Sequence, residues 1–306
     1  MSTNKISEDK KLEMYRCQLK TLLEIPKLQQ KTKEWYQARN NLITASDFAQ
    51  ALGAGKFGSQ RQLIEKKVDC VLYPDADAKP LKNMFFDWGN LFEPVACDVY
   101  ADMHGGVKVH EFGLIVHPHE DYFGASPDGI TDDGVMLEIK CPLKRKITEG
   151  GEIPEQYYYQ IQGQLEVCGL EQCDYFECEF QKYTSYEEYV SAYDKESYTG
   201  VIIDATEKTY PVLQKGKVCN PYDDDHAVYW VLKAFNLKRV TKDSEFVNIK
   251  LAELKKVWEK ILRYRNDPSA YTMEVKKKIS INTSSLKASA KSNSNTNTKY
   301  MIVDLE

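Results

Sequence analysis

The sequence predicts an α/β protein, of the α+β kind, in which helices flank a mixed central sheet. Apolar and aromatic residues recur at helical spacing over residues 84–102. Two short apolar runs joined by a turn signal follow at 123–139, and then come a helical pattern at 155–168 and a strand pattern at 174–181. Helices and strands in this order are typical of a mixed sheet that helices cover.

The segments before this core are predicted to be short helices. Residues 1–31 are charged and compatible with a helical extension, which Pro26 interrupts. Three residues of the kind that caps helices then precede helical stretches: Thr32 before 33–40, Ser46 before 47–52 and Ser59 before 60–68.

The apolar helix at 84–102 contains Pro94, which predicts either a kink or the start of the helix at that point. The pair Gly105-Gly106 predicts where this helix ends. A loosely alternating strand is expected after it, at 107–117.

Two acids and a lysine lie on the predicted hairpin that comes next. Strand side chains alternate between faces, so Glu138 and Lys140 share one face of the second strand. Folding back at the turn can bring Asp128 close to Glu138. The expected elements are strands at 123–130 and 135–139, joined by the turn Asp132-Asp133-Gly134.

An acid pair beside a lysine suits a Mg²⁺-dependent phosphodiesterase, with Mn²⁺ as an alternative cation. Hard divalent cations take carboxylate oxygens as ligands. The lysine can stabilise the attacking water or the charge that develops on the phosphate. The competing interpretation of this segment alone is an exposed hairpin with a surface salt bridge.

The C-terminal part is predicted to be β-like at first and then helical. Apolar residues beyond a disordered tether suggest a docking peptide; the alternative is a tail that packs on its own domain or on nothing. The expected segments are β-like pieces at 183–215, helices at 222–237 and 246–266 within a helical region 216–281, a disordered linker at 282–299, and the apolar-acidic heptad 300–306.

Composition restricts the classes of protein to which the chain can belong. The 306 residues suffice for one large domain or two small ones, and no apolar run is long enough for a membrane span. The N-terminus lacks the apolar stretch of a signal peptide, and the eight cysteines lack paired metal-ligand spacing, so we expect an intracellular, non-secreted protein with reduced thiols.

The net charge of −5 argues mildly against nucleic acid as a partner. A groove needs only local positive charge, because acids beyond about 8–10 Å are screened. The run Lys144-Arg145-Lys146 directly after the hairpin offers such a patch.

Five motifs in order make the chain resemble the YqaJ-like viral recombinase (phage lambda exonuclease) family of the PD-(D/E)xK nuclease superfamily. The resemblance covers about residues 32–181 and implies a restriction-endonuclease-like core, placed at 32–215. The motifs are Trp35-x-x-x-Arg39 with Ile43-Thr44-Ala45-Ser46, Gly89-x-x-x-Glu93, Ser126-Pro127-Asp128-Gly129, Glu138-Ile139-Lys140-Cys141-Pro142 and Tyr157-x-x-Gln160-x-Gln162.

The resemblance also implies roles for individual residues. Metal ligands are expected at Asp128, Glu138 and the Ile139 carbonyl, with Glu93 in the metal site or at its edge. Lys140 is expected to assist the attacking water, and Gln160 to lie beside the catalytic strand. The residues expected to contact DNA or phosphate, including the 5′ end of the degraded strand, are Arg39, Ser46, Arg145, Lys146 and Tyr157.

The activity implied is digestion of one strand of linear duplex DNA in the 5′→3′ direction, which leaves a 3′ overhang for recombination and repair. A single-strand annealing protein and a trimeric assembly are the implied partners, with the host cytoplasm or nucleus as the place of action if the chain is viral. Two other functions stay open: a structure-specific endonuclease of the same fold, and a non-catalytic DNA-binding or scaffold protein.

Each assigned residue also has a purely structural interpretation. Ser46 could cap its helix, and Arg39 could pair with Asp47 or Glu34. Glu93 could be a satisfied buried acid, and Tyr157 could stack on a base or only fill the core. Gln160 and Gln164, four residues apart on one helix face, could be hydrogen-bonded core amides.

Overall fold

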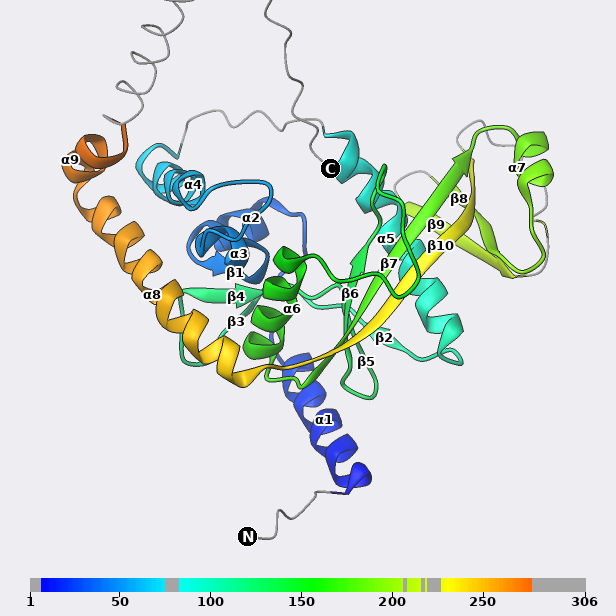
Figure 1. Ribbon diagram of the computed structural model, residues 1–306, viewed down its shortest axis with the longest axis horizontal. Helices are drawn as coiled ribbons and strands as arrows, with labels where there is room; N and C mark the ends of the chain where they lie inside the picture. Colours follow the sequence, from blue (N-terminus) through cyan, green and yellow to red (C-terminus); the bar gives the residue numbers. More distant parts are fainter. Residues whose placement is uncertain (1–6, 75–82, 206–207, 216–217, 219–226, 277–306) are drawn as a thin grey trace, which may run out of the picture.

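Helices surround two sheets in the computed structural model, which describes residues 7–74, 83–205, 208–215, 218 and 227–276 (Figure 1). The helices are α1 Glu8–Leu23, α2 Lys33–Asn40, η1 Ala45–Asp47, α3 Phe48–Ala51, α4 Gln60–Leu72, α5 Met84–Met103, α6 Glu155–Cys168, α7 Tyr186–Ala192, α8 Ser244–Asn266, α9 Pro268–Tyr271 and η2 Thr272–Lys276. The strands are β1 Ile43–Thr44, β2 Val109–His110, β3 Ile115–Val116, β4 Phe123–Ala125, β5 Gly129–Thr131, β6 Met136–Lys140, β7 Gln172–Tyr183, β8 Tyr198–Ala205, β9 Lys208–Lys215 and β10 Val228–Thr241.

The described strands form one large mixed sheet and one small sheet. The large sheet has seven strands in the order β2-β5-β6-β7-β10-β8-β9, and the small sheet has three in the order β1-β4-β3. Strands β6 and β7 are parallel, and α6 supplies the crossover between them, as a parallel pair requires. The mixed α/β class predicted from the sequence is confirmed.

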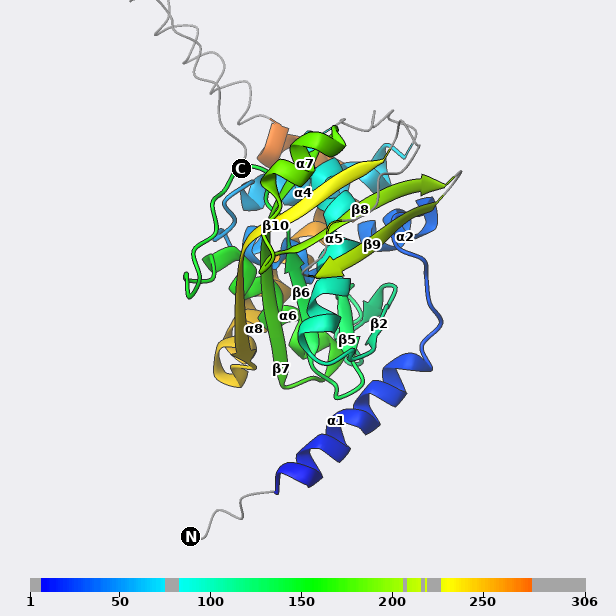
Figure 2. The same cartoon turned by 90° about the vertical axis from the view of Figure 1, so that its right-hand side faces the viewer.

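The two faces of β6 pack against different helices, and this alternation positions the candidate site. Leu137 and Ile139 belong to a core cluster that includes Phe92 and Val95 of α5. Met136 belongs to a second cluster, which includes Ile161 and Leu165 of α6. Figures 1 and 2 show α5 and α6 on opposite sides of the sheet. Glu138, two residues after Met136, therefore faces α6.

The predicted strand 123–130 is wrong as a single strand. It is interrupted at residues 126–128, so that β4 belongs to the small sheet and β5 to the large one. The expected strand 107–117 is divided in the same way into β2 and β3. Both interruptions move the chain from one sheet to the other, and the first of them places Asp128 in a bend between sheets.

The predicted helix 222–237 is also wrong over its described part, because residues 228–241 form the long strand β10, while residues 222–226 lie outside the described residues. It pairs antiparallel with β7 along most of its length and with β8 at its beginning. The expected helical region 216–281 therefore contributes a strand to the middle of the large sheet. The predicted helix 246–266 is confirmed as α8.

The sequence predicts several helix boundaries correctly. Thr32 caps α2 and Ser59 caps α4, in both cases through the side-chain oxygen. Ser46 is not a cap: Thr44 and Asp47 form the capping box of η1 instead. The apolar helix runs through Pro94 rather than starting there.

The N-terminal helix α1 projects from the lower end of the molecule in Figure 2, and its last turns pack on the core through Leu19 and Leu22. Arg16 pairs with Asp133 in the hairpin turn at 2.8 Å, and Gln18 donates to the Cys168 carbonyl at the end of α6. The predicted linker 282–299 and heptad 300–306 lie outside the described residues. None of the described helices combines the length and hydropathy needed to cross a membrane.

Candidate active site

The acids and the lysine of the hairpin converge at the end of β6. Asp128 Oδ2 accepts a hydrogen bond from the Ile139 amide at 2.7 Å, and Lys140 Nζ donates to Glu138 Oε1. The Glu138 side chain is fully buried, whereas 22% of the Lys140 side chain is exposed. The three groups therefore meet in one place that solvent reaches from the lysine side.

The electrostatics of this cluster are those of two buried carboxylates with one nearby cation. Burial raises the pKa of Asp128 well above its ordinary value, and the negative charge of Glu138 raises it further; Lys140 only partly offsets them. Burial lowers the pKa of Lys140, but the charges of Glu138 and Asp128 outweigh burial and raise it. The lysine is therefore an ammonium ion at neutral pH, and its positive charge offsets the effects of burial and of Glu138 on Asp128 only in part.

Gln164 on α6 connects this cluster to the next element. Its Nε2 donates to Glu138 Oε2 at 2.8 Å. Its own carbonyl oxygen, Oε1, is buried and has no hydrogen-bond partner among the described residues. An unsatisfied amide oxygen beside two carboxylates is an oxygen donor set of the kind that a hard divalent cation or one of its water ligands fits.

Glu93, expected in the metal site or at its edge, belongs to α5, and that expected role stays a prediction. Its charge contributes to the raised pKa of Asp128, after burial and Glu138. Its carboxylate pairs with Lys31 Nζ at 3.7 Å. Within the described ranges, no three His, Cys, Asp or Glu side chains gather closely enough to hold a metal by themselves.

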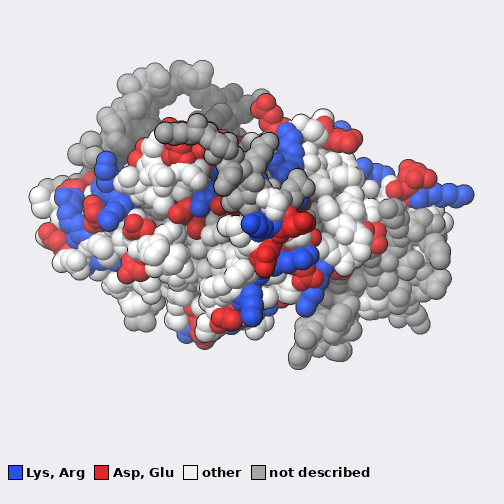
Figure 3. Space-filling view, turned by 90° about the horizontal axis from the view of Figure 1, so that it is seen from below, with Lys and Arg blue, Asp and Glu red and all other residues white. Residues whose placement is uncertain are grey.

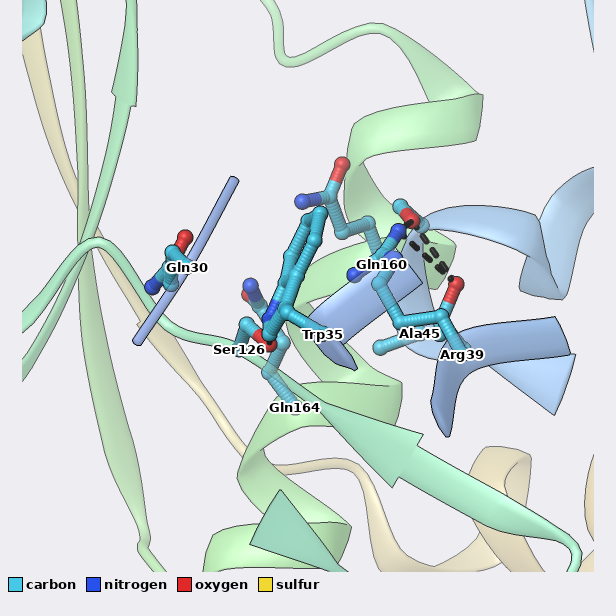
Figure 4. Close-up of a pocket in the computed structure, with 9 residues that line it drawn as sticks. Gln30, Trp35, Arg39, Ala45, Ser126, Gln160 and Gln164 are labelled. Carbon is cyan, nitrogen blue, oxygen red and sulfur yellow. Dashed lines mark hydrogen bonds between the residues drawn. The ribbon is translucent and has the colours of Figure 1, made fainter. Parts of the chain in front are cut away.

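A cavity of about 150 Å³ adjoins the acid cluster (Figure 4). Its lining joins side chains from α2, from the bend before β5 and from the inner face of α6. The lining residues are Gln30, Trp35, Arg39, Thr44, Ala45, Ser46, Ser126, Gln160 and Gln164. Gln164 thus takes part in both the cavity and the acid cluster.

Arg39 is the cationic group of this cavity. Its Nη2 donates to Ser46 Oγ at 2.9 Å and to Thr44 Oγ1 at 3.3 Å, and its guanidinium lies over the Trp35 ring, 4.2 Å from the centroid. Burial lowers the pKa of Arg39, and Asp47 opposes that shift. Asp47 forms its ion pair with Lys67 at 3.0 Å. The Arg39 guanidinium instead donates its hydrogen bonds to the hydroxyl groups of the cavity.

Two further predicted residues, Gln160 and Tyr157, both lie on α6. Gln160 lines the cavity one turn before Gln164, as the helix spacing predicts. Tyr157 lies half-buried beside the acid cluster, with Lys140 Nζ 5.1 Å from its ring centroid. Both positions are compatible with the expected roles, which stay predictions.

The basic run after β6 divides into two kinds of side chain. Arg145 pairs with Glu177, whose side chain is only 4% exposed, while Lys144 and Lys146 are exposed. The pair raises the pKa of Arg145 against the effect of burial. Figure 3 shows acidic and basic side chains intermingled over the face it displays, so any phosphate contact there depends on local cations.

Six cavity residues were not among the residues given a role from the sequence: Gln30, Trp35, Thr44, Ala45, Ser126 and Gln164. Trp35, Thr44 and Ser126 occur within the quoted motifs, and Trp35 Nε1 donates to Ser126 Oγ at 3.2 Å. That contact joins two of these motifs and could have been suspected from them. Gln30 carries no signal in the sequence, because only the fold brings it to the bend.

Part of this chain is similar in sequence to a viral protein. Uncharacterized protein R354 of Acanthamoeba polyphaga mimivirus is 29% identical over 191 residues, which are 56% of this chain and 33% of that protein. The chain therefore spans about a third of the length of that relative.

Two crystal structures share the fold. The alkaline exonuclease LHK-Exo of Laribacter hongkongensis has a TM-score of 0.53 at 21% identity, and its complex with dAMP has a TM-score of 0.52 at 22% identity. Each alignment covers 79% of this chain and 99% of the other. The model of the YqaJ-like viral recombinase domain matches residues 34–171, which carry the bend, the hairpin and α6. Residues 34–171 of the chain are therefore similar to the YqaJ-like viral recombinase domain.

Proposed function

We propose that the chain is a metal-dependent DNA exonuclease that digests one strand of linear duplex DNA from the 5′ end. The observation that carries the proposal is the buried pair Asp128 and Glu138 with Lys140 beside it, open to a cavity that holds an arginine. The recombinase domain and the fold shared with an alkaline exonuclease support the choice of DNA as substrate.

Asp128, Glu138 and the Gln164 carbonyl oxygen would hold the divalent cation, with Mg²⁺ as the expected ion and Mn²⁺ as an alternative. A bound cation of this kind lowers the pKa of a water molecule and stabilises charge on the phosphate. The Ile139 amide fixes the Asp128 carboxylate through its hydrogen bond. The Ile139 carbonyl stays a predicted ligand.

Lys140 acts as a fixed positive charge rather than as a base, because its pKa is raised and it stays protonated. Its ammonium donates to Glu138 and so orients that carboxylate. The same ammonium can donate to the attacking water or to a phosphate oxygen at the open side of the site.

The cavity beside the acids provides a place for the terminal 5′-phosphate. Arg39 and the hydroxyls of Ser46 and Thr44 are already arranged around one another there. A phosphate would give the charged guanidinium an ionised acceptor in place of these neutral hydroxyl acceptors, and hydrogen bonds between two ionised groups are stronger. Such a subsite would distinguish a strand end from the interior of a strand.

Digestion of end-labelled linear duplex, with readout of each strand, tests the proposal. With Mg²⁺ the purified chain should degrade the 5′-phosphorylated strand and leave covalently closed circles intact. Glu138→Ala should lower the rate on the order of a thousandfold, because it removes both a ligand and the partner of Lys140.

Near-native digestion by Glu138→Ala would reject this site. Cleavage of closed circles would instead favour an endonuclease of the same fold, and DNA binding without cleavage under either cation would favour a scaffold. The trimer and the annealing partner stay predictions, because they concern protein contacts that this experiment does not measure.

A further inference from the structure

We propose that Lys67 and Arg265 together form a cationic clamp behind the cavity, and that this clamp positions Arg39 for the 5′-phosphate of a DNA end. The inference rests on the proposed function, because it takes the cavity as the place of that phosphate. Arg265 belongs to α8, outside residues 34–171 that resemble the recombinase domain. The clamp would therefore make a C-terminal helix part of end recognition.

The clamp holds the end of α2, the helix that carries Arg39. The last carbonyls of a helix have no partner within it, and Arg39 lies in the last turn of α2. Lys67 Nζ donates to the Arg39 carbonyl at 2.7 Å. Arg265 Nη2 donates to the next carbonyl, that of Asn40, at 2.8 Å. Cations are favourable at this end of a helix, so the main chain of Arg39 is fixed while its guanidinium reaches into the cavity.

Arg265 joins three parts of the chain through one guanidinium group. Besides the Asn40 carbonyl at the end of α2, it donates to the Lys67 carbonyl of α4, from Nε at 3.0 Å and from Nη2 at 2.6 Å. Figure 1 shows the C-terminal end of α8 approaching α4. A planar guanidinium can donate to two carbonyls at once in a fixed geometry, which the single ammonium of a lysine does not reproduce.

The same clamp also orients the hydroxyl groups of the cavity. Lys67 Nζ lies 3.0 Å from Asp47 Oδ2, which in turn accepts the hydroxyl proton of Thr44 at 2.9 Å. Because a carboxylate only accepts hydrogen bonds, Thr44 has no proton left for Ser46, whose Oγ lies 2.9 Å away, and Ser46 must be the donor there. The Thr44 oxygen is thereby kept as an acceptor for Arg39.

One buried ammonium group therefore determines both ends of the arginine. It holds the main chain of Arg39 directly, and through Asp47 it holds an acceptor of the guanidinium. A group that is already ordered costs less free energy to bring against a ligand. A 5′-hydroxyl end offers the guanidinium no ionised acceptor, so loss of the clamp should weaken binding of phosphorylated ends selectively.

Binding of matched duplexes to the full-length protein in EDTA tests the inference, because the proposed cleavage needs a divalent cation. The measured quantity is the ratio of Kd for a 5′-hydroxyl duplex to Kd for the 5′-phosphorylated duplex, both carrying a fluorophore at the 3′ end. Arg265→Gln should lower this ratio by roughly threefold to thirtyfold, since a displacement of about 1 Å is costly at a built site. Arg265→Lys keeps the charge and should retain part of the ratio.

Arg263→Gln is the matched control on the same helix. Arg263 pairs with Glu274 on the exposed surface at 2.6 Å, and its substitution changes the net charge by the same amount. The ratio should stay within about twofold of that of the unmodified protein. Arg265 is substituted rather than Lys67, because loss of Lys67 would leave Asp47 without its cation in the interior and destabilise the fold itself.

A double variant separates positioning from a general effect on folding. Arg39→Gln removes the group that the clamp positions, so adding Arg265→Gln to it should leave the ratio unchanged. A purely structural role of Arg265 would instead weaken binding of both duplexes equally and leave the ratio of the single variant unchanged. Circular dichroism checks that each variant is folded.

A ratio that is unchanged in folded Arg265→Gln, or that falls equally in Arg263→Gln, overturns the inference. Digestion of the same duplexes with Mg²⁺ tests the proposed function separately, and normal digestion beside an unchanged ratio leaves that function standing. If the unmodified chain prefers the phosphorylated duplex but digests neither, the proposed function fails, while the ratios still decide the role of the clamp. Equal affinity of the unmodified chain for both duplexes overturns the inference, because the cavity would then not hold the phosphate.

Discussion

Gln164 donates one hydrogen bond to Glu138 across 2.8 Å, while its own buried carbonyl oxygen has no partner among the residues that the structure describes. The contact links α6 to β6 at the point where the acids gather. A buried side-chain amide whose NH₂ group is hydrogen-bonded but whose oxygen is not either binds a further group through that oxygen or lowers the free energy of unfolding. This relationship gives the first prediction.

Gln164→Leu should reduce kcat/KM for DNA digestion by about tenfold to a hundredfold, because partners that orient a metal ligand have effects of this size. Glu138 Oε2 would lose its donor, and the proposed cation would lose the amide oxygen. Steady-state digestion of labelled duplex at saturating Mg²⁺ measures the change.

Gln162→Leu is the matched control on the same helix. Gln162 donates to the Thr241 carbonyl and accepts from the Asp243 amide, so it holds the end of β10 and the start of α8. Its loss should lower the free energy of unfolding by about 1–3 kcal/mol and leave kcat/KM of the folded protein unchanged. If both variants lose activity equally, Gln164 acts only through folding.

Arg39→Gln should remove the preference for a 5′-phosphorylated end over a 5′-hydroxyl end. A charge-assisted hydrogen bond contributes about 1.5–3 kcal/mol, so we expect the preference to fall by roughly tenfold to a hundredfold. Digestion rates on matched duplexes that differ only in the terminal phosphate measure it. A preference that survives the substitution would place the phosphate outside the cavity.

Arg145 and Lys146 should behave differently although they are adjacent. Lys146 is exposed, so Lys146→Gln should reduce the slope of log Kd for DNA against log salt by about 1, with little effect on stability. Fluorescence titration of a labelled duplex at several salt concentrations gives the slope.

Arg145→Gln should instead lower the free energy of unfolding by roughly 3 kcal/mol, because it leaves the buried Glu177 without its cation. The Tyr175 hydroxyl still donates to Glu177 and limits the loss. Denaturant unfolding with and without the substitution tests this. An Arg145→Gln variant of native stability with a weaker salt dependence would show that Arg145 contacts phosphate directly.

Lys67→Met should destabilise the protein by about 3–5 kcal/mol at neutral pH, because Lys67 and Asp47 form a buried pair with side chains only 1% and 13% exposed. Burial alone would raise the pKa of Asp47, but the charge of Lys67 and further cations hold it below its ordinary value. The stability that this depressed pKa provides is present above the unfolded value and is lost as the pH falls through the folded pKa.

The difference in unfolding free energy between Lys67→Met and the unmodified protein should therefore shrink as the pH falls from the raised pKa of Asp47 in the variant to its lowered pKa in the unmodified protein, because over that range only the folded variant takes up the proton. Urea unfolding at a series of pH values measures it. A difference that stays constant down to pH 3 would mean that lost packing, not the charge of Asp47, causes the destabilisation.

The sequence by itself determined the features that depend on neighbouring residues. Glu138 and Lys140 share a face of β6 because strand side chains alternate with a period of two. Thr32 and Ser59 cap their helices because the capping oxygen reaches only amides two or three residues away. The helix that carries Gln160 and Gln164 has the bounds that its pattern predicts.

Only the tertiary structure decided the features that depend on distant segments. β10 is a strand because β7 and β8 offer it partners on both sides, which local preference cannot reveal. Ser46 accepts a hydrogen bond from Arg39 rather than capping a helix. Gln164 reaches Glu138 and Lys31 reaches Glu93 because two sheets, a crossover helix and the N-terminal extension meet at one bend. Such contacts are set by the packing of whole elements, and no local spacing encodes them.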